Sequence, residues 1–391
     1  MFNILKVLLS SVIPKGFIFI LNLVVARSLS LNEFGLYSYV KSFYNFFETI
    51  ISSSLVPHSI SSISNEVLRV EQIAAIYFLF AVLSSFLSVI VIVLDGTVTN
   101  IYIPIILFIA VFGSIMNSYM YVRCISADKI NILFLSSFLT LLILCFILFS
   151  ISISSSGYAV LFAFSFNCLD CLFKMFFLQK SSFKFNFEFK NLRLKKPIFL
   201  ISSLAINGTI FLFQRMLLVR TENGLEQMAY LEIVMIIFSL IAIFLSSQGN
   251  YLMARKQFTF LKYKVSAIKL MLFLTLASSS AYALVILFGS PGIYWIFNIK
   301  ISQSLCIAAS IMIFSYSIAF YSVRMVIMKN KQHITLYSTL ISAVFAFLPY
   351  AYLDISAISI VLSYAVFYFF LSLINYLFIY GGSYEVKKSF K

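Results

Sequence analysis

Residues 27–37 read RSLSLNEFGLY and separate the first two long apolar runs of the chain. A weaker copy, RTENGLEQMAY, occupies residues 220–230, in the second half of the 391 residues. The two copies share an arginine, a glutamate and a tyrosine at the same spacing, at Arg27, Glu33 and Tyr37 and at Arg220, Glu226 and Tyr230. The repeat predicts two related halves, each of which begins with a helix, a short polar link and a second helix.

The composition indicates a membrane protein of several spans. Hydrophobic residues make up 62% of the chain and charged residues only 10%, whereas a soluble domain carries roughly 25% charged residues. The apolar runs approach the roughly 20 residues that a helix needs to cross a bilayer. They lack sustained alternation of apolar and polar residues, so helices are favoured over a membrane barrel.

The runs predict an all-α membrane protein of twelve spans. We expect them at 7–26, 36–60, 73–94, 101–122, 131–150, 157–178, 198–219, 227–252, 267–288, 301–323, 334–353 and 357–379. Six spans precede and six follow the longest connection, the basic segment 179–197. The expected organisation is an N-terminal six-helix lobe (1–178), a cytoplasmic linker (179–197), and a C-terminal six-helix lobe (198–391) that ends in a short cytoplasmic tail.

The placement of basic residues predicts the topology. With both termini in the cytoplasm, 20 of the 28 lysines and arginines fall on the cytoplasmic side and three on the outer side. Lysine and arginine collect in cytoplasmic loops, so this bias supports the orientation. Because six is even, both lobes enter from the same side, and a pseudo-twofold axis along the membrane normal would relate them.

Charged residues inside the spans are candidates for function, because a charge in hydrocarbon is unfavourable and usually faces a cavity or a partner. Lys41 and Glu48 lie on one helical stripe, which either lines a cavity or holds two helices together. Lys15 either faces a cavity or extends to the cytoplasmic surface. Asp170 and Lys174 are spaced as a local ion pair, although Asp170 could also exchange an ion.

No enzyme motif appears in the sequence. There is no GxxxxGK, HExxH or GxSxG motif and no glycine-rich dinucleotide loop. The loops are short and leave little room for a soluble catalytic site. The sequence therefore favours a transporter over an enzyme.

The first link resembles the polysaccharide-exporter branch of the MOP superfamily, and the chain is most similar to the Wzx-type O-antigen flippases. The resemblance rests on a pattern of an Ala-Arg pair, a leucine and an EFGLY stretch, here Ala26, Arg27, Leu29, Glu33, Phe34, Gly35, Leu36 and Tyr37. It implies a MATE-like fold of two lobes in the bacterial inner membrane. It also implies movement of undecaprenyl-diphosphate-linked repeat units from the cytoplasmic to the periplasmic leaflet by alternating access.

Under this resemblance the charged residues acquire expected roles. Basic side chains suit a diphosphate, which makes Lys15, Lys41, Arg123, Arg215 and Arg324 the substrate candidates. Glu48 and Asp170 are candidates for coupling to H+ or Na+, because a carboxylate inside a membrane can exchange a proton. Arg27, Glu33, Gly35, Arg220 and Glu226 are expected to shape the outer links without touching substrate.

Three other functions stay open. A MATE-like ion-coupled multidrug exporter and a lipid II flippase would share the fold, and a membrane polysaccharide polymerase would share the composition. The surplus of basic residues within the spans favours an anionic substrate. The expected partners are the lipid-linked oligosaccharide, membrane lipid and other polysaccharide-assembly proteins of the membrane, with no nucleic acid and no cofactor besides a coupling ion.

Overall fold

A computed structural model describes residues 2–64, 70–98, 100–150, 153, 155–178, 195–254, 290–328 and 331–385. Within these residues all regular structure is helical. The helices are α1 (Phe2–Ser28), α2 (Leu31–Ser64), α3 (Val70–Asp95), α4 (Tyr102–Ser126), α5 (Ile130–Ser150), α6 (Ser156–Phe177), α7 (Lys195–Val219), α8 (Gly224–Ala254), α10 (Ser290–Phe297), α11 (Gln303–Met328), α12 (Gln332–Phe345), the 3-10 turn η1 (Leu348–Ala351) and α13 (Ala357–Glu385).

The helices overlap all the predicted spans except one, the span at 267–288, which lies outside the described residues. The sequence did not predict the short helix α10, whose second residue is Pro291. Proline is tolerated there because the first turn of a helix leaves its N–H groups unused. Eight described helices are long and apolar enough to cross a membrane, so the chain is a multi-pass membrane protein. The count of twelve spans stays a prediction.

Helix α3 shows the division between a lipid-facing and a protein-facing side. Leu83, Phe86 and Ile90 are exposed on one side, although each is large and apolar. Ala81 and Ser85 are buried on the other side, against the rest of the unit. An apolar stripe of this size would be unfavourable in water, but it suits contact with hydrocarbon.

The chain divides into two compact units, Met1–Leu212 and Phe213–Lys391. The division falls within α7, so most of this helix belongs to unit 1, whereas the sequence assigned it to the second lobe. Most of the predicted linker, residues 179–194, lies outside the described residues, and its last three residues form the start of α7. The lobe boundaries therefore remain predictions.

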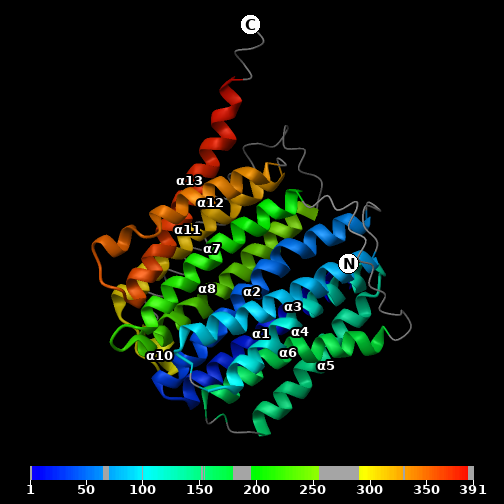
Figure 1. Cartoon of the computed structure of the whole chain (residues 1–391), viewed down its shortest axis with the longest axis horizontal. Coiled ribbons are helices and arrows are strands. Elements are labelled where there is room, and N and C mark those ends of the chain that lie inside the picture. The colour runs from blue at the N-terminus through cyan, green and yellow to red at the C-terminus, as the bar shows by residue number, and fades with distance from the viewer. Residues whose placement is uncertain are drawn as a thin grey trace. The chain divides into compact units, whose positions relative to one another are not determined.

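The same packing scheme occurs in each unit. In unit 1, α4 packs on α6, α2 contacts both of them, and α5 packs on α6. In unit 2, α11 packs on α13, α8 contacts both, and α12 packs on α13 (Figure 1). Each unit thus repeats one order of helix contacts, as expected for two related halves. The pseudo-twofold axis between the lobes stays a prediction.

Candidate functional site

The first link is shorter than the sequence motif that marks it. Only Leu29 and Ser30 lie between α1 and α2. The Ser30 hydroxyl accepts a hydrogen bond from the Glu33 N–H at 3.3 Å, and the Ser30 carbonyl accepts one from Phe34 N at 2.9 Å. Ser30 therefore caps α2, as serine commonly does at a helix start. Gly35 lies buried inside α2, so the expectation that it shapes the turn is wrong.

Glu33 connects this link to α6, another helix of unit 1. Its Oε2 accepts a hydrogen bond from the backbone N–H of Ser156, the first residue of α6, at 2.9 Å. The first N–H groups of a helix have no partner within the helix and carry partial positive charge, so a carboxylate suits this position. Glu33 thus fixes the start of α2 against the start of α6.

Unit 2 contains the same connection at an adjacent sequence position. Oε1 of Gln227, in the first turn of α8, accepts a hydrogen bond from Ala357 N, at the start of α13, at 3.2 Å. The sequence alignment paired Glu33 with Glu226, but Gln227 makes the equivalent contact. The repeated motif therefore marks a structural joint within each unit, and the joint in unit 2 uses a neutral amide.

The second link, unlike the first, depends on a glycine, which lies at a position that does not align with Gly35. Asn223 has a positive φ of 57°, and Gly224 follows as the first residue of α8. A Cβ on Gly224 would clash with the carbonyl oxygen atoms of Leu218 and Val219 at the end of α7. Arg27 and Arg220 are both exposed near these links.

Lys41 lies buried between α1 and α2, with a relative exposure of 7%. Its ammonium group donates a hydrogen bond to Asn22 Oδ1 at 3.1 Å and lies 5.7 Å from the centre of the Tyr37 ring. The Tyr37 hydroxyl donates to the same Asn22 oxygen at 2.7 Å. The stripe that joins Lys41 to Glu48 is divided, because Lys41 is buried whereas Asn45, one turn further along the same stripe, is exposed.

Glu48 and Lys15 come within electrostatic range of each other, although they belong to different helices. The negative charge of Glu48, in α2, attracts the ammonium group of Lys15, in α1. Glu48 is partly buried and Lys15 is exposed. The cavity position of Lys15 stays a prediction.

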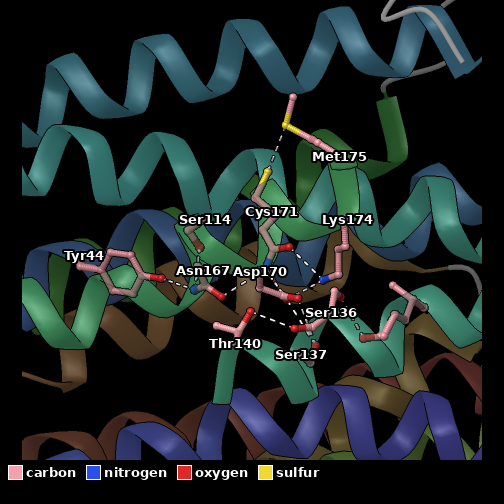
Figure 2. Close-up of polar contacts among 12 residues, drawn as sticks. Tyr44, Ser114, Ser136, Ser137, Thr140, Asn167, Asp170, Cys171, Lys174 and Met175 are labelled. Carbon is pink, nitrogen blue, oxygen red and sulfur yellow. Dashed lines mark hydrogen bonds and ion pairs between the residues drawn. The ribbon is translucent and has the colours of Figure 1, made fainter. Parts of the chain in front are cut away.

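Asp170 and Lys174 form an ion pair inside unit 1. The Lys174 ammonium lies 2.6 Å from Asp170 Oδ2, and the two side chains are only 1% and 4% exposed. Lys174 also donates to Asn117 Oδ1 at 2.9 Å, and Asn117 Nδ2 donates to Asp170 Oδ2 at 3.2 Å. Ser137 lies 3.3 Å from each carboxylate oxygen of Asp170. Figure 2 shows the Asp170 carboxylate and the Lys174 ammonium facing each other beside Ser137.

The ion pair belongs to a larger polar network that reaches α2. Asn167 accepts a hydrogen bond from Asn117 at 3.2 Å and donates to Ser114 Oγ at 3.3 Å and to the Tyr44 hydroxyl. The Tyr44 ring stacks on Phe164 with 4.4 Å between ring centroids. The network therefore joins α2, α4, α5 and α6, and Figure 2 shows it running from Tyr44 to Lys174.

Unit 2 has its own buried charge, Arg215, near the end of α7. Arg215 is buried and donates a hydrogen bond to the Tyr364 hydroxyl, and it lies within electrostatic range of Glu232. Its Nε has no hydrogen-bond partner among the described residues. The neighbouring Gln214 donates to Ser363 Oγ at 2.6 Å. Residues of α7, α8 and α13 thus surround one guanidinium group.

The two arginines expected at the cytoplasmic ends of α4 and α11 have matching environments. Arg123 hydrogen-bonds to Tyr119, one turn earlier on α4. Arg324 lies over the ring of Phe320, one turn earlier on α11, at 5.0 Å from its centroid. Each arginine therefore contacts an aromatic residue one turn earlier on its own helix, Arg123 through a hydrogen bond and Arg324 over the ring.

The structure brings some of the predicted site residues together and adds partners that the sequence did not reveal. Lys15 approaches Glu48, and Arg215 approaches Glu232. Asn117, Ser137 and Tyr364 were missed, since uncharged polar residues are common in membrane helices and carry little signal alone. Within the described residues no cluster of histidine, cysteine or acidic side chains could hold a metal.

Comparisons with known proteins identify the fold. No protein-family model and no curated protein matches the chain. Among solved structures, it is similar to an inward-facing multidrug resistance MATE family transporter of the MOP superfamily, with a TM-score of 0.62, 13% identity, and coverage of 97% of this chain and 98% of the other.

Two further structures agree. A MOP superfamily transporter from Pyrococcus furiosus, described as having a binding pocket of reverse polarity, gives a TM-score of 0.57 at 11% identity over 96% of this chain and 93% of its own. A eukaryotic MATE transporter gives 0.51 at 16% identity over 96% and 91%. The chain therefore has the fold of these MATE family and MOP superfamily transporters.

Proposed function

We propose that this protein is a flippase for undecaprenyl-diphosphate-linked saccharide, such as an O-antigen repeat unit. It would move the head group from the cytoplasmic to the periplasmic leaflet of the bacterial inner membrane by alternating access. The MATE-like fold supports the transporter part of this proposal. The choice of substrate depends on the charges buried in the membrane helices and on the resemblance of the first link.

The observation that carries the proposal is the excess of buried positive charge. Among the described residues, three basic side chains and two acidic ones are buried: Lys41, Lys174 and Arg215 against Asp170 and Glu232. Asp170 neutralises the charge of Lys174, and the negative charge of Glu232 attracts the Arg215 guanidinium group. A helix interior biased to positive charge suits a diphosphate better than an organic cation.

We assign the phosphate contact first to Lys41, which is buried in α2. Its ammonium group donates to Asn22 and lies beside the Tyr37 ring, and an ammonium group binds phosphate oxygen atoms well. Arg215 could act in the same way, because its Nε is a buried donor without a described partner. The polyprenyl tail would stay in the bilayer while the head group crosses.

A deletion strain tests the function. The strain should accumulate polyprenyl-diphosphate carrying single repeat units, which a membrane-impermeant lectin or glycosidase added to spheroplasts cannot reach. Plasmid-borne wild-type protein should restore surface saccharide. A Lys41→Ala variant at the same membrane abundance should restore roughly a tenth or less, because a charged hydrogen bond to a phosphate contributes about 1.5–3 kcal/mol. Normal surface saccharide in the deletion strain would refute the proposal.

The same strain separates the alternatives. A MATE-like exporter of organic cations fits the fold equally well and predicts unchanged saccharide with increased sensitivity to cationic drugs. A lipid II flippase predicts cell lysis and accumulated peptidoglycan precursor. A polymerase predicts single units that are accessible from outside, because they have already crossed the membrane.

A further inference from the structure

The Asp170 carboxylate has the surroundings of a cation site. The Lys174 ammonium nitrogen lies 2.6 Å from Asp170 Oδ2 and 2.9 Å from Asn117 Oδ1. Ser137 Oγ lies within 3.3 Å of the same carboxylate. A carboxylate, an amide oxygen and a hydroxyl are the ligands that hard cations prefer. In this structure the positive charge beside these oxygen atoms is the ammonium group of Lys174.

The surrounding network fixes the orientation of these oxygen atoms. Asn117 directs its Oδ1 to Lys174 because its Nδ2 is occupied by Asp170 and Asn167. Asn167 is held in turn by Ser114 and the Tyr44 hydroxyl. Side chains from α2, α4, α5 and α6 therefore orient the oxygen atoms around one ammonium group (Figure 2).

We propose that the Lys174 ammonium permanently occupies a monovalent-cation site in unit 1, so that Asp170 neither takes up nor releases a free cation during transport. One carboxylate balances one positive charge, and the remaining ligands are neutral. A mobile cation would have to displace a tethered one that cannot diffuse away. This inference concerns coupling and holds whichever substrate the transporter carries. It also revises the sequence-based expectation that Asp170 carries the coupling ion.

The proposal has a clear consequence for a variant that lacks the ammonium group. Shortening Lys174 to alanine leaves the carboxylate buried without its counter-ion, which is strongly unfavourable. The oxygen atoms of Asp170 and Asn117 would then border the space left by the ammonium group, with the Ser137 hydroxyl beside the carboxylate, and these groups suit Na+ or K+. The variant should therefore bind an alkali cation from solution, whereas the wild type should not.

Thermal unfolding of the purified full-length protein in detergent tests this inference. Wild type, Lys174→Ala and the double variant Asp170→Asn/Lys174→Ala are compared in chloride salts of sodium, potassium and N-methylglucamine at equal ionic strength. We expect one midpoint for the wild type in all three salts. The single variant should unfold at a higher temperature in sodium or potassium, by an amount that grows with salt concentration. The double variant should lose this dependence, because it has no buried carboxylate.

Two results would overturn the proposal. One is a wild-type midpoint that rises in sodium or potassium and no longer does so in an Asp170→Asn variant, which would mean that Asp170 binds a free cation in the native protein. The other is a single variant that shows no alkali effect, or that cannot be purified in any salt while the double variant can. The wild-type measurement stands even if neither variant folds. Because no substrate is added, the result is independent of whether the flippase proposal is correct.

Discussion

The joint made by Glu33 allows a quantitative prediction. Its Oε2 accepts the Ser156 N–H at 2.9 Å, at the start of α6. A side-chain bond to a helix N-terminus contributes about 1 kcal/mol, and a negative charge there adds about 0.3–1 kcal/mol. Glu33 is only partly buried, so the charge contribution belongs at the low end of that range. Replacing Glu33 by alanine should therefore cost about 1–1.5 kcal/mol.

The amide replacement separates the hydrogen bond from the charge. Glu33→Gln keeps an acceptor and loses the charge, so it should cost only about 0.3 kcal/mol. In unit 2 the native residue is already an amide. Gln227→Ala should therefore cost about 1 kcal/mol and Gln227→Glu should be neutral or slightly stabilising.

Thermal unfolding in detergent at low ionic strength measures these differences. For a unit of this size, about 1 kcal/mol corresponds to about 2–4 °C in the midpoint, so Glu33→Ala should lower it by about 2–6 °C. Asn32→Ala is the matched control, because Asn32 is exposed in the same helical turn. Equal midpoints for Glu33→Ala and Asn32→Ala would refute the capping argument. A Glu33→Gln variant as unstable as Glu33→Ala would show that the charge, and not the hydrogen bond, carries the effect.

Three further predictions concern the helices and the site. Gly113→Ala should lower the unfolding midpoint, because the new Cβ would clash with the Cys168 thiol and overpacking costs about 1–3 kcal/mol. Adding Cys168→Ala to the same chain should recover part of this loss. An unchanged midpoint for Gly113→Ala would contradict the close approach of the two helices. Reporter fusions after Gly96 and after Asp128 should report the periplasm and the cytoplasm respectively, and the reverse pattern would overturn the orientation. Asn22→Ala should reduce transport less than Lys41→Ala in a flux assay, because it removes a holder of the ammonium group but keeps the charge; equal losses would assign Lys41 a structural role.

The sequence predicts the local features of this protein well. Apolar runs placed the described helices other than α10, because a span must satisfy its own backbone hydrogen bonds in lipid and this leaves a long continuous signal. The Asp170 and Lys174 pair was also predictable from the sequence, because residues four apart on a helix are neighbours.

Contacts between side chains of different helices could not be predicted from the sequence. Asn117 and Ser137 meet Asp170 only after α4, α5 and α6 have packed, and nothing in their own segments marks them. The motif around Glu33 located a joint but assigned the turn to Gly35, which is part of α2. The equivalent residue of unit 2 was missed by one position, because the aligned glutamate, Glu226, is not the residue that reaches α13.

The close approach of α4 and α6 has a mechanical consequence. Gly113 lets the two backbones come together at Cys168, and the ion-pair network joins the same helices one turn further along. Because α4 and α6 are in contact at two successive turns, neither helix can slide or rotate against the other without breaking several of these contacts at once. Deformation of unit 1 should therefore concentrate in a more compliant helix. Within the described residues, α1 contains Pro14, which removes a backbone hydrogen bond from the helix interior, and Gly16 beside it has open space around it. On this reasoning α4 and α6 form the stiff frame of the unit, and α1 is a helix that can flex.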